Sequence, residues 1–451
     1  MVINIHPSAA SNFNTKAEEL IGLIEEFQKE EEKRDSFPSD LHVAASITDK
    51  DIIGDIEVAT SDYQGNIIAR FFHFNEKKFG LNEENYGKLR DIAEQLQSLA
   101  AIRSKLSCTF VEKSLFSWIS KKYQEADVQD MFIEYLDAEA QAVVKKITSW
   151  VPIANLEVQC AFPISNSEIR PLSKALIDKW QGKVESLSGK NKENAIKLFE
   201  KIRKDNQGLA SIVTTIEAEP DYAYDFALEE AQKITAVLGI FSGATLIPDI
   251  KCVSNIKGSE NIAQSTIFFE NDEDSFQMSS SIIDSSSAKY WRLGQREVIE
   301  IRKTGLDKIS SLLSSKSLKD FEKSVLNSLF LYSKSAFTAD PVEKVVHMLS
   351  SLESILLKNE NEPIQQNLAE RIAVFTAQKL EERKHIIKTI KSIYGVRSRY
   401  LHHGHTSSEL KLISEFMMQV WVFFIQLLAN IDRFKSQADF VNAIDDHKLS
   451  G

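Results

Sequence analysis

The longest apolar run in the chain, residues 416–431, restricts the fold more than any other feature of the sequence. It is shorter than the roughly 20 residues that cross a bilayer as a helix, and Gln419, Gln426 and Asn430 interrupt it. A helix with so little polar surface must be surrounded by other elements, because water would otherwise contact its apolar side chains. We therefore expect a buried core helix, no membrane span, and partner helices around it.

The partner helices are expected in the hundred or so residues before this run. Each segment has apolar residues three or four positions apart, which is the period of an amphipathic helix. Asp340-Pro341 is a favourable N-cap and first-turn pair for the second segment. The apolar positions of the four segments are Phe321, Val325 and Leu329; Val345, Leu349, Leu352 and Leu356; Leu368, Ile372 and Phe375; and Ile386, Ile387, Ile390, Ile393 and Tyr394. The sequence predicts an all-α bundle over 306–451.

The N-terminal part has a different pattern. An acidic amphipathic helix is expected over 16–34, with Leu20, Leu23, Ile24 and Phe27 on one stripe. Runs rich in β-formers follow at 52–61 and 67–74, and a Gln64-Gly65-Asn66 turn signal between them indicates a hairpin. Helical patterns then dominate. Residues 1–150 are therefore predicted to form an α+β region.

The middle of the chain also alternates between the two patterns. We expect a strand over 211–219, a helix over 221–240 and several short strands within 249–301. A chain of 451 residues has enough material for two or three domains. The predicted fold class is an α+β N-terminal and middle region followed by an all-α bundle, with boundaries that give 1–150, 151–305 and 306–451.

Charge is distributed unevenly along the chain. The net charge is −11, yet residues 302–435 hold 20 Lys and Arg against 14 Asp and Glu, so this part carries +6 and the rest −17. Six basic residues lie between 383 and 399, with no acidic residue among them. The C-terminal third is thus the expected binder of anions, although a solvated helix face has the same composition.

The cysteine content and the N-terminus indicate a cytoplasmic protein. The three cysteines are far apart in the sequence, which predicts neither a disulfide framework nor a thiolate metal site. Residues 1–15 are polar and lack the basic and then apolar regions of a secretory signal.

The segment from Tyr394 to His405 is the one stretch whose residue types suggest a reaction centre. It holds two arginines and three of the nine histidines. Arginine is permanently cationic and its planar fork suits phosphate, while histidine exchanges protons near neutral pH, so the pair predicts chemistry on a phosphodiester. Closely spaced histidines also suggest zinc, but no Cys, Asp or Glu lies between Leu401 and Ser408 to complete a site. We predict no metal and no cofactor.

Helix geometry restricts how Arg397 and His402 can act together. On an uninterrupted helix they would be about 140° apart around the axis, and His403 would be no better placed. Gly395 and Gly404 weaken the helical pattern around the motif. The two groups can meet at one phosphate if the helix breaks there, or if they come from two chains related by a twofold axis. A homodimer with a composite site is therefore a testable expectation.

The string Tyr394-x-x-Arg397-Ser398-x-x-x-His402-x-Gly404, preceded by apolar helices, resembles the HEPN superfamily, the higher eukaryote and prokaryote nucleotide-binding domain, and in particular its Apea-like branch. Glu353 matches an acidic position that the family tends to keep in the second helix. The resemblance covers roughly residues 315–435. His402 and His403 both have an allowed spacing from Arg397, and we prefer His402. By residue type alone, Glu353 fits a solvated helix position and Tyr394 fits the edge of the core.

The resemblance implies metal-independent endoribonuclease activity, in which the RNA 2′-hydroxyl attacks the adjacent phosphorus and leaves a cyclic phosphate end. His402 would exchange the proton and Arg397 would stabilise the charge on phosphorus, with Glu353 orienting one of them. The expected substrate-binding residues are Tyr394, Ser398, Arg399, Tyr400 and His403.

Two hypotheses about function follow. In the first, the protein is a cytoplasmic endoribonuclease, an antiviral defence effector or toxin-like protein, whose residues 1–300 bind an unknown trigger and restrain the basic bundle. In the alternative, the bundle is a non-catalytic RNA- or protein-binding dimerisation module. Replacing Arg397 or His402 by Ala separates the two, because only the first predicts a loss of RNA cleavage with folding retained.

Overall fold

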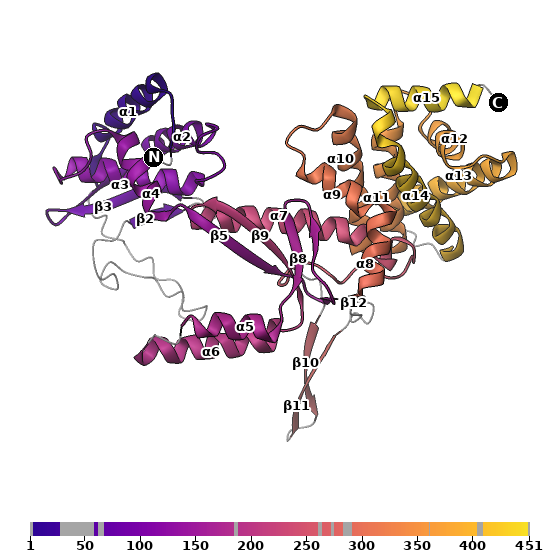
Figure 1. Ribbon diagram of the computed structural model, residues 1–451, viewed down its shortest axis with the longest axis horizontal. Helices are drawn as coiled ribbons and strands as arrows, with labels where there is room; N and C mark the ends of the chain where they lie inside the picture. Colours follow the sequence, from indigo (N-terminus) through magenta and orange to yellow (C-terminus); the bar gives the residue numbers. More distant parts are fainter. Residues whose placement is uncertain are drawn as a thin grey trace. The chain divides into compact units, whose positions relative to one another are not determined.

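The computed structural model describes residues 3–27, 58–61, 67–184, 188–259, 264–271, 275–282, 291–359, 361–403 and 409–449. The chain divides into two compact units, one of residues 1–147 with 215–226 and one of residues 148–214 with 227–451. The N-terminal and middle parts are mixed α/β and the C-terminal part is mostly helical (Figure 1). This coarse description agrees with the predicted fold class, while the domain boundaries near residues 150 and 305 stay a prediction.

The first unit packs helices against a four-stranded sheet. The sheet has the order β1-β4-β3-β2, and each neighbouring pair is antiparallel. The hairpin expected over 52–61 and 67–74 is confirmed where the structure describes it, because β2 and β3 pair; residues 52–57 and 64–66 lie outside the described residues. The elements of this unit are α1 (Pro7–Ile21), β1 (Glu25–Phe27), β2 (Val58–Ser61), β3 (Ile67–Phe74), β4 (Lys77–Leu81), α2 (Glu83–Gln97), α3 (Cys108–Tyr123) and α4 (Phe132–Val143).

The helix expected over 16–34 was placed too far along the chain. The helix α1 begins at Pro7, because Pro occupies its first position and the ring of His6 accepts a hydrogen bond from the Ser8 N–H. It ends before Gly22, and β1 then pairs with β4, where the Phe27 ring contacts Phe71 edge-on at 4.6 Å. Sheet pairing thus determined the conformation of residues whose apolar spacing also fitted a helix. Residues 28–34 lie outside the described residues.

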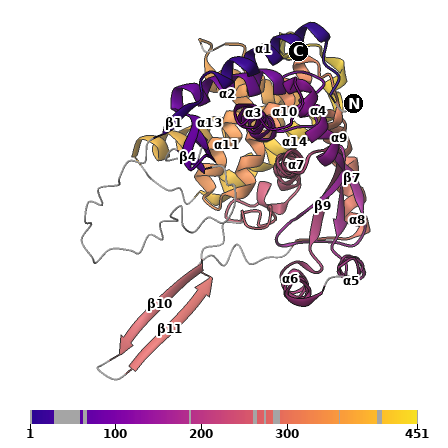
Figure 2. The same ribbon diagram turned by 90° about the vertical axis from the view of Figure 1, so that its left-hand side faces the viewer.

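A small sheet of order β5-β9-β8-β7 lies mostly in the second unit, and in it β7 with β8 and β8 with β9 are antiparallel. The strand expected over 211–219 and the helix over 221–240 are confirmed as β9 and α7. Two further pairs are the parallel β6–β12 and the antiparallel hairpin β10–β11, whose strands lie side by side in Figure 2. The end of the 249–301 segment is helical, which corrects the expectation of strands there. The bounds are β5 (Lys145–Pro152), β6 (Leu156–Val158), β7 (Phe162–Ile164), β8 (Ser167–Pro171), α5 (Lys174–Gly182), α6 (Gly189–Asn206), β9 (Ala210–Ala218), α7 (Pro220–Ile240), β10 (Gln264–Asn271), β11 (Ser275–Ile282), β12 (Trp291–Leu293) and α8 (Gln295–Ile301).

The helical bundle completes the second unit (Figure 1). The five helices expected from apolar periodicity are confirmed as α10 to α14. Asp340 caps α11 as predicted, since its side chain accepts hydrogen bonds from the N–H groups of Val342 and Glu343. The sequence did not predict α15, in which only Phe440, Val441 and Ile444 are buried. The bounds are α9 (Asp307–Ser314), α10 (Asp320–Lys334), α11 (Pro341–Leu356), α12 (Ile364–Thr376), α13 (Leu380–His403), α14 (Leu410–Asn430) and α15 (Gln437–Leu449).

The long apolar run at residues 416–431 falls mostly in α14, which lies in the core of the bundle. By length and composition, Leu410–Arg433 is apolar enough to cross a membrane, a test that core helices also pass. The prediction of a core helix is confirmed by burial, whereas this feature assigns no location in the cell. The buried residues of α14 are Ile413, Phe416, Met417, Val420, Phe423, Phe424, Leu427 and Leu428.

Candidate functional site

The first component of the candidate site is Glu353, near the C-terminal end of α11. This helix faces the core with Val345, Leu349, Leu352 and Leu356, all of which are fully buried. Glu353 follows Leu352 directly, so it lies beside the buried face, with its side chain about 20% exposed. A carboxylate at such an edge is stabilised by a cation or hydrogen-bond donor from a neighbouring helix.

The partners of Glu353 come from α13, which runs without interruption from Leu380 to His403. The expectation that Gly395 weakens the helix here is wrong. A glycine costs about 1 kcal/mol in a helix interior, but Ile393 and Val396 on either side of it are buried and hold the backbone against the bundle. Arg397 and His402 could meet through a break in the helix or in a site shared by two chains. The continuous helix excludes the break.

Three of the predicted site residues converge on one point between α11 and α13. One oxygen of Glu353, Oε1, accepts a hydrogen bond from the Tyr394 hydroxyl and another from Arg397 Nη1, each at 2.8 Å. The Arg397 guanidinium carbon lies 6.0 Å from the centre of the Tyr394 ring, which adds a weak cation–π attraction. Tyr394 and Arg397 are three positions apart, so both reach Glu353 from one side of α13.

The electrostatics of this cluster keep Tyr394 protonated and leave Arg397 incompletely bonded. Burial, followed by the negative charge of Glu353, raises the pKa of Tyr394 far above its usual range, so its hydroxyl remains a donor. Arg397 is about one quarter exposed, but its Nε is buried and has no hydrogen-bond partner among the described residues. An unpaired buried donor on a cation costs free energy, while the exposed part of the guanidinium remains open to an anionic ligand.

His402 is not part of this cluster. It lies five residues after Arg397 on the same continuous helix, which places it about 140° around the axis and about 7.5 Å along it. Its side chain is exposed. One chain therefore does not bring this imidazole and the Arg397 guanidinium to the same phosphate.

The remaining predicted site residues point to several different neighbours. Ser398 is exposed, and Arg399 forms a largely exposed ion pair with Glu409 at 2.9 Å. Tyr400 lies near the first turn of α11, where slight desolvation and the negative charges of Asp340 and Glu343 raise its pKa. The backbone of His403 is helical, and its side chain lies outside the described residues, as do residues 404–408.

Sequence reasoning did not single out two titratable residues of α11. Lys344 is fully buried and donates to the backbone carbonyls of Ala244 and Ser335 at 2.6 and 3.0 Å, and burial lowers its pKa to about 8. His347 is half-buried, and burial together with the positive charge of Lys334 lowers its pKa. No sequence signal marks either residue, because a basic residue near the start of a helix is usually solvated.

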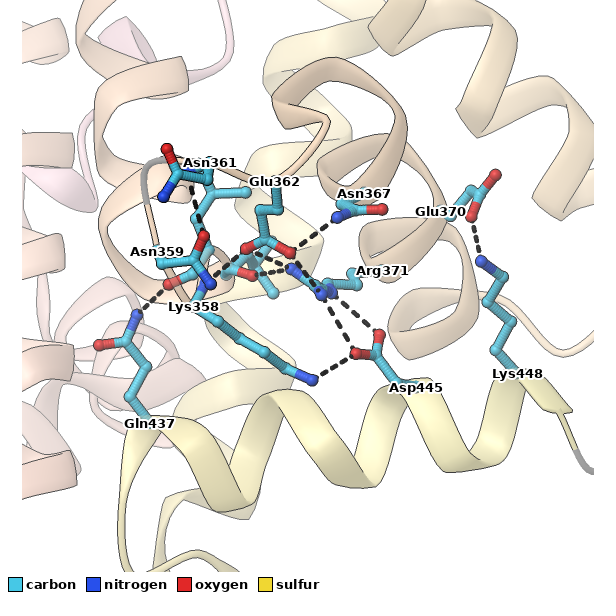
Figure 3. A network of polar contacts seen from close by, with 12 residues as sticks. Lys358, Asn359, Asn361, Glu362, Asn367, Glu370, Arg371, Gln437, Asp445 and Lys448 are labelled. Carbon is cyan, nitrogen blue, oxygen red and sulfur yellow. Dashed lines mark hydrogen bonds and ion pairs between the residues drawn. The ribbon is translucent and has the colours of Figure 1, made fainter.

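A second arginine of the bundle forms a denser network (Figure 3). Arg371 on α12 lies between the carboxylates of Glu362 and Asp445 and contacts both of them in a two-pronged manner, at 2.9 to 3.1 Å. It also donates to the Leu356 carbonyl at 2.7 Å, and Lys358 forms an ion pair with Asp445 at 2.8 Å. This network fixes α15 to the loop between α11 and α12.

No protein-family model, no curated protein and no solved structure matches this chain. The interpretation of the cluster therefore depends on its own geometry and on the sequence motif.

Proposed function

We propose that this protein is a metal-independent endoribonuclease with a HEPN-like bundle, acting as a homodimer. The observation that carries the proposal is the state of Arg397. Glu353 fixes the guanidinium through a single bond, while Nε has no partner among the residues that the structure describes, and the side chain is still partly open to solvent. An RNA phosphate would bind at the exposed part of the guanidinium, and the permanent cation would neutralise the charge of the phosphate.

The proposed reaction is an intramolecular transesterification of RNA. The 2′-oxygen forms a bond to phosphorus as the bond from phosphorus to the 5′-oxygen breaks, which leaves a 2′,3′-cyclic phosphate and a 5′-hydroxyl. The 2′-hydroxyl loses a proton and the 5′-oxygen gains one, and His402, or His403 as the alternative, exchanges a proton in this step. Arg397 stabilises the negative charge that accumulates on the phosphoryl oxygens.

A twofold arrangement of two chains is part of the proposal, because the continuous α13 separates the two groups within one chain. Arg397 of one protomer would meet His402 of its partner at each of two sites. Three large apolar side chains of α13 and α14, Leu401, Leu410 and Met418, are 42 to 55% exposed and support an interface in this part of the bundle. A cytoplasmic role as a defence effector or toxin, with a trigger bound by residues 1–300, belongs to the same proposal.

The experiment uses the purified full chain and a mixed RNA pool in the presence of a chelator. We expect new ends with 5′-hydroxyl and cyclic phosphate groups from the wild type, and their loss in Arg397→Ala. The matched control is Arg302→Ala, since Arg302 also forms an arginine–carboxylate pair in this unit, with Asp307 at 2.8 Å, but lies outside α13. Intact RNA with the wild type, under conditions in which RNA binding is measured, contradicts the proposal.

One observation favours the alternative of a non-catalytic binding module. Within one chain, the Arg397 cluster and His402 are on different sides of α13, and Glu353 already neutralises the arginine, as expected for a purely structural pair. In that case Arg397→Ala lowers the stability of the bundle and leaves the RNA ends unchanged.

A further inference from the structure

The solvent-facing side of α13 carries a row of basic residues. Lys384, Lys388 and Lys391 are exposed and follow one another at spacings of four and three, which places them within about 60° of one another around the helix axis. Ser398 and His402 continue the same row at spacings of seven and four, and both are exposed. Lys384 and His402 are 18 residues apart, which is five full turns, or about 27 Å along the axis.

The opposite side of α13 is buried, so this row cannot turn toward the core. Ile386, Ile390, Ile393 and Val396 are at most 9% exposed and pack in the bundle. On the outer side there is a shallow depression of about 500 Å³, lined by Lys384, Ile387, Lys388, Lys391 and Ser392. The three lysines therefore line a single concave surface.

The three lysines differ in how closely carboxylates approach them. Among the described residues, Lys388 and Lys391 form no ion pair, although the charge of Lys391 contributes to lowering the pKa of Glu370. Lys384 contacts Glu381 at 2.8 Å, but both side chains are more than half exposed, so water screens that pair.

Other exposed lysines of the second unit differ from Lys388 and Lys391. Lys303, Lys319 and Lys323 each have a carboxylate within 4.0 Å. A concave surface with uncompensated positive charge is unexpected in a chain whose net charge is −11, and its sign matches that of an anionic ligand.

We propose that Lys384, Lys388 and Lys391, here named the α13 basic stripe, bind the phosphate backbone of RNA and direct the strand along α13 toward His402. The link to His402 rests on the proposed function; the binding of RNA by the stripe does not. Lysines are flexible point charges, which suit a row of phosphates, and none of the described residues that line the depression is aromatic, so base stacking is not expected there. The stripe therefore binds RNA without regard to sequence.

The test measures RNA binding without cleavage. The probe is a fluorescent 20-nucleotide RNA with 2′-O-methyl groups throughout, which lacks the attacking hydroxyl, and its affinity for the full chain is measured over a range of salt concentrations. In the triple variant K384Q/K388Q/K391Q we expect at least tenfold weaker binding at low salt. A plot of log affinity against log salt has a negative slope, and this slope should become less steep by about 2. Each phosphate contact on a single strand contributes about 0.7, and the variant removes three of them.

The control variant is K303Q/K319Q/K323Q, which removes the same charge from lysines outside α13. We expect its affinity to stay within about twofold of the wild type and its salt slope to be unchanged. Equal losses in both triple variants, or none in the stripe variant, overturn the proposal. Equal affinity of the wild type for polyglutamate and for the RNA probe also overturns it, because the surface would then select acidic proteins as well.

The stripe and the nuclease activity can fail separately. If the stripe variant loses RNA binding while the wild type leaves unmodified RNA intact, the stripe proposal is supported and the nuclease proposal fails. If the wild type cleaves RNA and the stripe variant binds and cleaves equally well, only the stripe proposal is overturned.

Discussion

Two arginines of the same bundle, Arg371 and Arg397, meet carboxylates in different ways. Arg371 is about 5% exposed, and its five N–H groups are matched by five acceptor contacts, to Glu362, Asp445 and one backbone carbonyl (Figure 3). Arg397 is about 26% exposed, donates once to Glu353, and has a buried Nε without a partner among the described residues.

The difference separates a structural arginine from a candidate functional one. A buried guanidinium with all its donors paired stabilises the helices that it joins, and it has no capacity left for a ligand. A guanidinium held by one carboxylate is oriented but retains donors for a second anion.

The largest effect on stability is expected at Arg371. Its replacement by Ala leaves two carboxylates, Glu362 and Asp445, facing each other in a partly buried site, and we expect the free energy of unfolding to decrease by about 3 to 5 kcal/mol. Arg302→Ala, at an exposed pair, should change it by less than about 1 kcal/mol. Denaturant unfolding of the full chain measures both, and equal changes in the two variants would mean that Arg371 contributes no more than a surface pair.

The reverse pattern is expected for Arg397. Arg397→Ala should lower the rate of RNA cleavage by about 100- to 1000-fold, the loss seen when one donor to a developing negative charge is removed. Stability should decrease by only about 1 kcal/mol, since Tyr394 still donates to the partly exposed Glu353. If Arg397→Ala destabilises the bundle as strongly as Arg371→Ala does, the role of Arg397 is structural.

Acid should weaken the Arg371 network and so lower the free energy of unfolding at acidic pH. Burial alone would raise the pKa values of Glu362 and Asp445, but hydrogen bonds, first among them those from Arg371, outweigh it and lower both from 4.5 and 3.8. The unfolded chain therefore binds more protons below about pH 4.5, so this stability is fully present above pH 4.5 and is lost as the pH falls through the lowered values. The dependence should be weaker in Arg371→Ala, as measured by unfolding at pH 3 to 6.

The smallest effect is expected at Tyr394. Tyr394→Phe removes one hydrogen bond to Glu353 and keeps the ring beside Arg397, so the free energy of unfolding should decrease by roughly 0.5 to 1.5 kcal/mol. Cleavage should fall less than in Arg397→Ala, because Arg397 still contacts Glu353. Tyr224→Phe, at an exposed tyrosine outside the bundle, serves as the control. A loss of cleavage equal to that of Arg397→Ala would instead make Tyr394 a direct participant.

The fold of the bundle was the part most accessible from the sequence. Apolar periodicity located α10 to α14, because each of these helices buries one face against its neighbours. The same signal was too weak for α15, which has few buried residues. This helix is held in part by the ion pair of its Asp445 with Arg371, which lies 74 residues away in the sequence. It was misleading at residues 25–27, where strand pairing replaced the expected helix.

The candidate site was only partly accessible. Residue types and the family resemblance pointed to Glu353, Tyr394 and Arg397, which the structure brings together although Glu353 and Arg397 are 44 residues apart. Local spacing does not encode such a contact between helices, nor does it distinguish a saturated arginine such as Arg371 from an unsaturated one. The roles of the three residues, and of His402, stay predictions.

The most direct test of a site shared between two chains combines Arg397→Ala and His402→Ala. Each variant alone should be inactive. In a heterodimer of the two, purified through different tags, one of the two sites would hold Arg397 from one protomer and His402 from its partner, so we expect about half of the wild-type cleavage rate. A heterodimer no more active than either parent variant would contradict the shared site, and with it the proposed nuclease mechanism.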